Sequence, residues 1–188
     1  MKRGINTKCL HLEDEEGCFD NYGSLSYPIY QTATYAHPAV GESTGYDYSR
    51  LQNPTREHLE KIVAALEDGI DAIALSSGMA AITLLMEIFK QGDHVIVDSD
   101  LYGGSIRLFS NVSEKNNISF SRVDCHKEKV EAYITENTKA IYIETPTNPM
   151  MNVTDIEAMA KIAHERGLLL IVDLSLIHIS EPTRRRGI

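Results

Sequence analysis

The sequence predicts an α/β fold with a mainly parallel sheet and flanking helices, and three observations indicate this class. Short apolar runs alternate with segments of helical periodicity over most of the chain, as expected when crossover helices join parallel strands. Several runs are followed directly by Gly, Ser, Tyr, Asn or Asp, at the strand ends where such sheets bind ligands. An apolar content of 43% over 188 residues suits one globular domain with a sizeable core.

The first long helix is expected to begin at Pro54, because Asn53 is a favourable N-cap and proline suits the first helical position. Apolar residues then recur on one face from Arg56 to Asp68. The strands predicted after this helix are Ile70–Leu75, His94–Asp98, Ile118–Val123, Ala140–Glu144 and Leu168–Asp173. The helices predicted between and around them are Met79–Lys90, Gly104–Glu114, Lys127–Thr135 and Asp155–Arg166. For the last helix, Thr154 and Glu157 form a capping box and Gly167 is the terminator.

The stretch before the first long helix has a different character. From Met1 to Gly45 it is rich in Gly, Pro, Ser and Tyr, and its apolar-aromatic segment, residues 28–35, is favoured as extended chain by Pro28 and Pro38. Such a segment cannot bury its own aromatic rings, so we expect residues 1–53 to be an arm that contacts a neighbouring subunit. An α/β domain over residues 54–173 follows it.

The last stretch, residues 174–188, does not continue the alternation and contains three consecutive arginines. A basic tail for nucleic acid is one interpretation. However, residues 174–179 can be back-translated as CTGTCTCTTATACACATC, which is similar to the transposon end used as an adapter in DNA library preparation. We therefore expect an adapter-derived tail that is not native to the protein. Without it, 15 basic residues stand against 26 acidic ones, a net charge of -11, which argues against a nucleic-acid partner.

The composition also indicates in which cellular compartment the protein is expected and whether it is expected to bind a metal. The sequence has no transmembrane run, and Met1 to Leu10 lacks the apolar region of a signal peptide, so a cytoplasmic protein is expected. Its cysteines, Cys9, Cys18 and Cys125, are odd in number and scattered, which fits reduced thiols. Cys9, His11 and Cys18 could be metal ligands, but no second cluster completes a set of four, so no metal site is expected.

The turn at Ser77 and Gly78 is the first candidate binding element. It joins the predicted strand that ends at Leu75 to the predicted helix that follows, and a helix start offers unpaired N–H groups and a positive dipole end to an oxyanion. Tyr48 and Arg50 add a phenol and a guanidinium two residues apart, which suit a phosphate. An ordinary turn and solvated surface residues remain the plain alternatives.

Asp173 is the second candidate. It ends the apolar run of residues 168–172, which predicts a strand buried on both faces, where a carboxylate must be paired or protonated. A cation on a ligand could be its partner, and the plain alternative is a capping or surface aspartate.

Together these segments carry a resemblance. YDYSRLQNPT, SSGMAA, DLYGGS, ETPTNP and IVD occur in this order, and the chain resembles the pyridoxal-phosphate enzymes of transsulfuration, the cystathionine γ-synthase and cystathionine lyase family. The resemblance covers Tyr27 to Asp173, roughly the first half of a family member. It implies the fold type I of pyridoxal-phosphate transferases, with a truncated large domain that binds the cofactor only in part.

The resemblance implies two groups of phosphate ligands. Ser77, Gly78 and Met79 would bind the phosphate of pyridoxal 5'-phosphate through backbone and hydroxyl donors. Tyr48 and Arg50 would reach the phosphate of a neighbouring subunit's cofactor. The intact parent would then be a homo-oligomer, a dimer of dimers.

The resemblance also implies three contacts to the cofactor ring. Tyr102 would stack on it and take part in acid–base steps. Asn148 would hydrogen-bond the ring hydroxyl. Asp173 would pair with the protonated ring nitrogen and keep the ring cationic, which is the form that stabilises a carbanion on an amino-acid substrate.

One departure from the family pattern concerns the catalytic lysine. The resemblance places the Schiff-base lysine in a Ser-x-Thr-Lys segment downstream of the aspartate, and the arginine that binds the substrate carboxylate lies further on; this chain contains neither. We therefore expect the 188 residues to be an inactive fragment of a parent protein that is an active enzyme. We also expect its sheet to end on an unpaired strand, with poor solubility as the result.

Within the family, we expect a cystathionine γ-synthase-like activity, γ-replacement on an activated homoserine ester with cysteine, as in methionine biosynthesis. Gly104 stands where methionine γ-lyases carry a cysteine, which disfavours that activity. A cystathionine β- or γ-lyase is the alternative. Outside catalysis, the chain could be a non-catalytic partner that lends Tyr48 and Arg50 to a full-length subunit. A nucleotide-binding domain is disfavoured, because the chain has neither a P-loop lysine nor a Gly-x-Gly-x-x-Gly turn.

Overall fold

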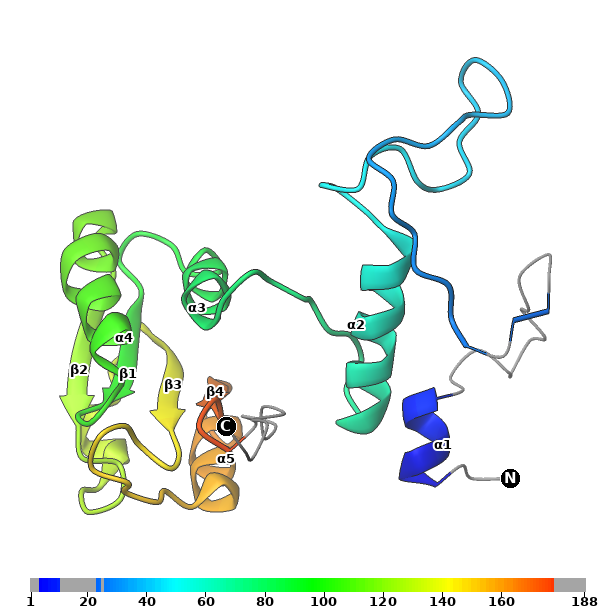
Figure 1. Cartoon of the computed structure of the whole chain (residues 1–188). Coiled ribbons are helices and arrows are strands. Elements are labelled where there is room, and N and C mark those ends of the chain that lie inside the picture. The colour runs from blue at the N-terminus through cyan, green and yellow to red at the C-terminus, as the bar shows by residue number, and fades with distance from the viewer. Residues whose placement is uncertain (1–3, 11–22, 25, 178–188) are drawn as a thin grey trace, which may run out of the picture. The chain divides into compact units, whose positions relative to one another are not determined.

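The computed structural model describes residues 4–10, 23–24 and 26–177. The chain forms two compact units, Met1–Leu75 and Ser76–Ile188, so helix α2 (Pro54–Leu66) lies in the first of these units (Figure 1). The sequence-based boundary at residues 53 and 54 therefore differs from this division. Among the predicted features, His11, Cys18 and most of the tail, residues 178–188, lie outside the described residues. No helix in the described part of the chain is long and apolar enough to cross a membrane.

The first unit is built around α2. Its start at Pro54 is as predicted, because the Asn53 side chain accepts a hydrogen bond from the Thr55 N–H at 2.9 Å. A short helix, α1 (Ile5–Leu10), precedes it. Lys8 of α1 donates to the carbonyl of Ala65 at 2.6 Å, near the end of α2. Helix α1 was not predicted, because six residues are too few to show a helical period.

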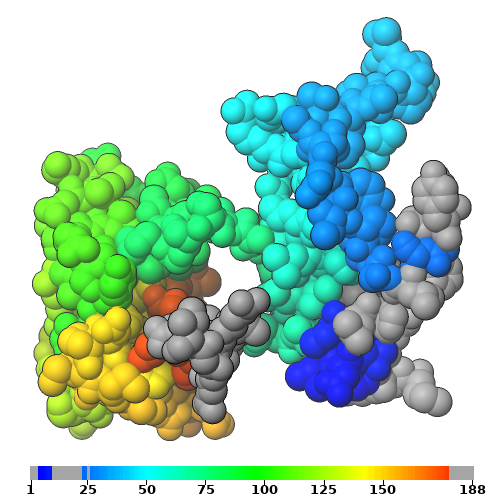
Figure 2. Space-filling model, viewed as in Figure 1, coloured from blue at the N-terminus to red at the C-terminus, as the bar shows by residue number. Residues whose placement is uncertain are grey.

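The arm between these helices pairs with itself over a short distance. Thr34 and Tyr48 form an isolated antiparallel bridge, and the Ser49 N–H donates to the Ala33 carbonyl at 2.8 Å. The loop that joins these segments, around residues 37–45, stands out from the rest of the first unit (Figure 2). Tyr48 of this bridge and Arg50 lie in the short segment that leads to the start of α2 at Pro54.

The second unit contains a parallel four-stranded sheet in the order β2-β1-β3-β4 (Figure 1). Its strands are β1 (His94–Asp98), β2 (Ser119–Val123), β3 (Thr138–Glu144) and β4 (Leu169–Asp173). The predicted α/β class and these four strands are confirmed. β4 lies at an edge of the described sheet, so the expectation that it is buried on both faces was wrong; Leu169 is 52% exposed.

The remaining predicted strand, Ile70–Leu75, is not formed. The segment has no regular secondary structure and no described segment pairs with it, while Ile70 and Ile73 are 105% and 69% exposed. Its Ala74 N–H donates instead to the Glu60 carboxylate of α2 at 2.8 Å. An apolar run becomes a strand only where a neighbour accepts its hydrogen bonds, and the two edges of the described sheet are β2 and β4.

The helices of the second unit follow the prediction with one exception. They are α3 (Gly78–Met86), α4 (Gly103–Leu108) and α5 (Ile156–His164), and α4 continues through a π-helical segment, η2 (Phe109–Ser113), and a 3-10 turn, η3 (Glu114–Asn116). The predicted helix Lys127–Thr135 was wrong: only a 3-10 turn, η4 (Val130–Tyr133), forms there. Lys129 has extended backbone, with φ -78° and ψ 96°, which interrupts a helix.

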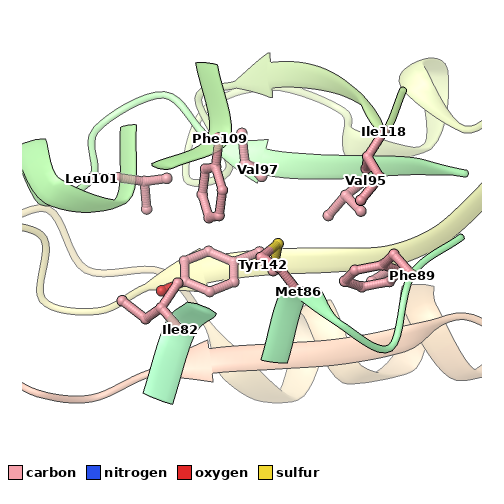
Figure 3. Close-up of a cluster of buried hydrophobic side chains, with 10 residues drawn as sticks. Ile82, Met86, Phe89, Val95, Val97, Leu101, Phe109, Ile118 and Tyr142 are labelled. Atoms are coloured by element: carbon pink, nitrogen blue, oxygen red, sulfur yellow. The ribbon is translucent and has the colours of Figure 1, made fainter. Parts of the chain in front are cut away.

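Two apolar clusters cover the two faces of the sheet. Val95, Val97 and Tyr142 pack with Ile82 and Met86 of α3 in the first cluster (Figure 3). Alternate residues of the same strands pack with α5 in the second cluster, which includes Ile96, Ile141, Ile143, Met159 and Ala163. Successive strand side chains point to opposite faces, so the continuous apolar runs are explained by helices on both sides.

The N-cap of α5 is Asp155 and not Thr154. The Asp155 carboxylate accepts from the Ala158 N–H at 3.0 Å, whereas Thr154 is buried and its N–H donates to the Thr145 hydroxyl at 3.0 Å. The predicted capping box was therefore wrong by one position, because tertiary contacts hold Thr154. Gly167, with φ of +66°, ends the last turn as predicted.

Asp98, the last residue of β1, is a buried carboxylate that is 2% exposed. It accepts a hydrogen bond from the Asp100 N–H at 3.2 Å and one from the Thr154 hydroxyl at 3.5 Å. Burial raises its pKa above the usual value. These contacts join the end of β1 to the segment that enters α5.

We predict that Asp155→Ala lowers the free energy of unfolding by about 1 kcal/mol, because the Ala158 N–H loses its acceptor. Urea unfolding followed by circular dichroism measures this difference. The matched control is Glu157→Ala, which removes the other member of the predicted capping box and should change stability by less than about 0.5 kcal/mol. Equal losses in the two variants would contradict the assignment of the cap.

We predict that Asp98→Asn gains stability relative to the wild type as the pH rises from 4 to 8. Because burial raises the pKa of Asp98, the folded chain retains this proton where the unfolded chain has lost it, so the wild type loses stability as the pH rises through that window. Urea unfolding across the pH series measures the difference, with Asp71→Asn as the exposed control. A difference between Asp98→Asn and the wild type that stays constant with pH would contradict the prediction.

Candidate functional site

A cavity of about 400 Å³ lies at the carboxyl ends of β3 and β4 and the start of α3. Its lining comprises Ser77, Gly78, Met79, Ile82, Tyr102, Glu144, Asn148, Asp173, Ser175 and Leu176. The structure thus brings together six of the eight residues predicted from the sequence. This size falls within the usual range for small-molecule sites.

The start of α3 provides backbone donors to the cavity. Ser77 is the N-cap, and its hydroxyl accepts from the Ala80 N–H at 3.1 Å. In the described part of the chain, the N–H groups of Gly78 and Met79 have no acceptor. A Cβ added at Gly78 would meet nothing within 4 Å, so the space above this backbone is open. An anion fits at such a helix start.

Tyr102 is positioned by its neighbours on both sides. Its backbone N–H donates to the Glu144 carboxylate at 2.7 Å, while the residue is 45% exposed. A Cβ added at Gly104 would lie 2.4 Å from the Tyr102 ring and 2.8 Å from the Met79 sulfur. The absence of a side chain at Gly104 therefore lets the Tyr102 ring lie beside the start of α3.

Glu144 is a site residue that the sequence analysis missed. It is buried, and its two carboxylate oxygens accept from the N–H groups of Tyr102 at 2.7 Å and Asn148 at 2.9 Å. Burial raises its pKa. Glu144 therefore joins the loop after β1 to the loop after β3. The sequence could have indicated Glu144 in the same way as Asp173, because both residues end an apolar run that predicts a strand.

Asn148 lies on a loop that is fastened to the end of β1. Asp100 accepts hydrogen bonds from the Thr147 hydroxyl and, at 3.3 Å, from the Asn152 amide. The Thr147 N–H donates to the Asn152 carbonyl at 2.9 Å, which closes the loop. The Asn148 side chain itself is exposed and has no hydrogen-bond partner among the described residues, so its amide is available to a ligand.

Asp173 is half-buried, and protein donors hold its carboxylate. One oxygen accepts from the Tyr142 hydroxyl at 2.9 Å, and the other accepts from the Ser175 N–H at 3.0 Å. Tyr142 is 1% exposed. Burial, followed by the charge of Asp173, raises the pKa of Tyr142 far above its usual range, so its hydroxyl stays neutral and donates.

Tyr48 and Arg50 belong to the first unit, and neither lines the cavity. The Arg50 guanidinium lies over the Tyr48 ring, 5.0 Å from its centroid, which is a cation–π contact. The two side chains that were expected to bind phosphate as a pair are therefore adjacent.

The residues that line the cavity suit a phosphorylated aromatic ring with a cationic nitrogen. A phosphate fits at the open start of α3, an aromatic face is present at Tyr102, and a carboxylate at Asp173 can pair with a cation. No lysine or arginine is among the described residues that line the cavity.

The chain is 52% identical to "Cystathionine gamma-synthase/O-acetylhomoserine (thiol)-lyase" of Bacillus subtilis, over 92% of this chain and 46% of that protein. It is also 52% identical to "Cystathionine gamma-lyase" of the same organism, over 80% of this chain and 40% of that protein. The chain thus spans about half the length of these relatives.

Two solved structures of related proteins are also similar to this chain. The "Crystal structure of metB from Corynebacterium glutamicum" matches 92% of this chain and 45% of that one, with a TM-score of 0.83 and 42% identity. A cystathionine gamma-lyase from Lactobacillus plantarum complexed with L-serine matches 92% and 45%, with a TM-score of 0.81 and 41% identity. The model of the Cys/Met metabolism PLP-dependent enzyme family matches residues 6–178, and the chain therefore belongs to this family.

Proposed function

We propose that the chain is the N-terminal part of a transsulfuration enzyme that performs γ-replacement on an activated homoserine ester with cysteine. The observation that carries this proposal is the 52% identity to the Bacillus subtilis protein named for cystathionine γ-synthase and O-acetylhomoserine (thiol)-lyase activity, over 92% of this chain. The composition of the cavity supports it, because the cavity combines an anion site, an aromatic ring and a carboxylate.

In this proposal, residues of the cavity bind pyridoxal 5'-phosphate. The N–H groups of Gly78 and Met79, together with the Ser77 hydroxyl, hold the phosphate, and Asn148 donates to the ring hydroxyl. Tyr102 covers one face of the ring, and its hydroxyl can carry a proton. When bound, the cofactor supplies an electron sink for the carbanion of the substrate.

Asp173 has a separate role in the proposal. Its carboxylate faces the ring nitrogen and keeps that nitrogen protonated, because an adjacent negative charge favours the cationic form. Glu144 holds the backbone of Tyr102 and Asn148 and thereby orients two of the contacts to the ring.

The arm also has a place in this proposal. Tyr48 and Arg50 bind the cofactor phosphate of a neighbouring subunit in this proposal, and the intact parent is proposed as a cytoplasmic homotetramer, a dimer of dimers. The three parts of the chain are then the arm 1–53, a partial cofactor-binding domain 54–173 and an adapter-derived tail 174–188. The exposed Arg50 and its contact with Tyr48 support a binding role for the pair.

A cystathionine lyase is the second candidate. It is favoured by the 52% identity to the Bacillus subtilis "Cystathionine gamma-lyase" and by 41% identity to the "Cystathionine beta-lyase" of Coxiella burnetii. The two reactions differ in the fate of the substrate: a synthase joins cysteine to the homoserine skeleton, and a lyase breaks cystathionine by elimination.

The test starts from the source DNA, read past the Asp173 codon in a library prepared without the transposon adapter. If the frame continues into a Ser-x-Thr-Lys segment, the full-length protein is assayed with O-acetylhomoserine and cysteine, and separately with cystathionine alone. We expect cystathionine from the first assay and little keto acid from the second. We expect Asp173→Asn to reduce the rate by about 10²-fold or more, as for loss of a preorganised charge.

Other results would overturn the proposal. Formation of pyruvate or 2-oxobutanoate from cystathionine as the dominant reaction would favour the lyase. If residues 174–188 are encoded by the genome as given, the non-catalytic partner becomes the leading interpretation. That interpretation requires the chain to co-purify with a full-length subunit.

We predict that Gly104→Ala in the full-length protein weakens the binding of pyridoxal phosphate by about tenfold, the loss expected from one displaced aromatic contact. The new Cβ would lie 2.4 Å from the Tyr102 ring and must push it aside. Gly103→Ala is the matched control, because its Cβ would meet only the end of the Arg107 side chain, at 3.6 Å. A fluorescence titration of the apoenzyme measures both affinities. Equal affinities in the two variants would contradict the role of Gly104.

A further inference from the structure

Tyr142 connects the apolar core to the candidate site. The residue is 1% exposed and belongs to the first apolar cluster, where its ring lies beside Ile82 and Met86 of α3 (Figure 3). The hydroxyl at the tip of this ring donates to the Asp173 carboxylate at 2.9 Å. A buried core residue therefore bonds directly to a residue that lines the cavity.

The register of the sheet explains this contact. Tyr142 of β3 is paired with Ile171 of β4, and Glu144 is paired with Asp173. Tyr142 and Asp173 are thus diagonal neighbours on one face of the sheet, a separation that a long aromatic side chain can span. Since the ring is packed in the core, the position of the hydroxyl is set by the core as well as by the carboxylate.

The Tyr142 hydroxyl is a neutral donor. Burial and the charge of Asp173 both raise the pKa of Tyr142, and the nearby Ser105 hydroxyl opposes them only in part. Ser105 is itself fully buried, and its hydroxyl makes no hydrogen bond of good geometry within the described residues. The Tyr142 hydroxyl therefore donates its hydrogen bond to Asp173.

The other donors to the Asp173 side chain are the N–H and hydroxyl of Ser175. Ser175 lies in residues 174–188, the stretch that the sequence predicts to be adapter-derived. Tyr142 is the donor that lies in the β-sheet itself, so it remains beside Asp173 whatever follows this aspartate in the parent.

We propose that Tyr142 is a positioning residue that acts through Asp173: its hydroxyl holds the carboxylate in the orientation that faces the ring nitrogen of the cofactor. The inference rests on the proposed function, because it requires the cofactor in this cavity. The inference predicts that loss of the Tyr142 hydroxyl weakens the binding only of a ligand whose ring carries the nitrogen.

The test measures the affinity of the full-length apoenzyme for two ligands by fluorescence titration. One is pyridoxal phosphate, and the other is its analogue with carbon in place of the ring nitrogen. In Tyr142→Phe we expect binding of pyridoxal phosphate to weaken by about tenfold, the loss of one hydrogen bond to a charged group. The affinity for the carbon analogue should stay within about twofold of the wild type, because it has no nitrogen for Asp173 to meet.

Tyr133→Phe is the matched control, since it removes a hydroxyl that donates to the exposed Glu128 at 2.6 Å and does not line the cavity. It should change neither affinity. Far-ultraviolet circular dichroism and the urea midpoint of each variant establish that the core is intact. Ser105→Ala is a second variant beside the same hydroxyl, and it should retain the wild-type preference for the nitrogen ligand.

The outcomes separate the two proposals. Equal weakening of both ligands by Tyr142→Phe would assign the residue to packing alone and overturn the inference, and so would no change in either. A wild type that binds neither ligand would overturn the proposed function itself, and the inference with it. A wild type that binds both ligands equally would overturn the pairing of Asp173 with the ring nitrogen, on which the inference depends.

Discussion

The candidate site depends on the register between β3 and β4. This register places Glu144 directly beside Asp173, so two carboxylates stand at the same edge of the sheet. The chain gives them different partners: Glu144 is buried and accepts two backbone N–H groups, whereas Asp173 is half-buried and accepts the Tyr142 hydroxyl. Burial, and to a smaller extent the charge of Asp173, raises the pKa of Glu144. One carboxylate therefore organises the loops, while the other remains available to a ligand.

Two carboxylates, one at the end of β1 and one directly after it, bind loop residues at this edge of the sheet. Asp98 binds the segment that enters α5, and Asp100 binds the loop that carries Asn148. The loop between β3 and α5 is therefore held by side chains from the end of β1 and from the residues directly after it. Since the donors are the hydroxyls of Thr147 and Thr154 and the amide of Asn152, these bonds fix side chains of the loop against the end of β1.

Several features of the fold could be predicted from local sequence. The start of α2 follows from Asn53 and Pro54, and β1, whose bounds were predicted correctly, follows from the apolar run of residues 95–97 between His94 and Asp98. Predictions failed where a distant partner decides the outcome. Residues 70–75 have the composition of a strand but no described neighbour, and Thr154 has the composition of an N-cap but is held by Thr145 and Asp98.

By itself, the sequence determined the fold class and three residues that line the cavity, Ser77, Gly78 and Asp173, because strand ends and helix starts are local features that periodicity and capping residues reveal. Three further lining residues, Met79, Tyr102 and Asn148, were expected from the resemblance to the family. Only the tertiary structure decided the roles of Glu144 and Tyr142. Both lie in one apolar strand, and neither differs locally from an ordinary core or strand-end residue. Their partners, Tyr102 and Asn148 for Glu144 and Asp173 for Tyr142, are brought to them by the register of the parallel strands, which pairs residues far apart in the chain.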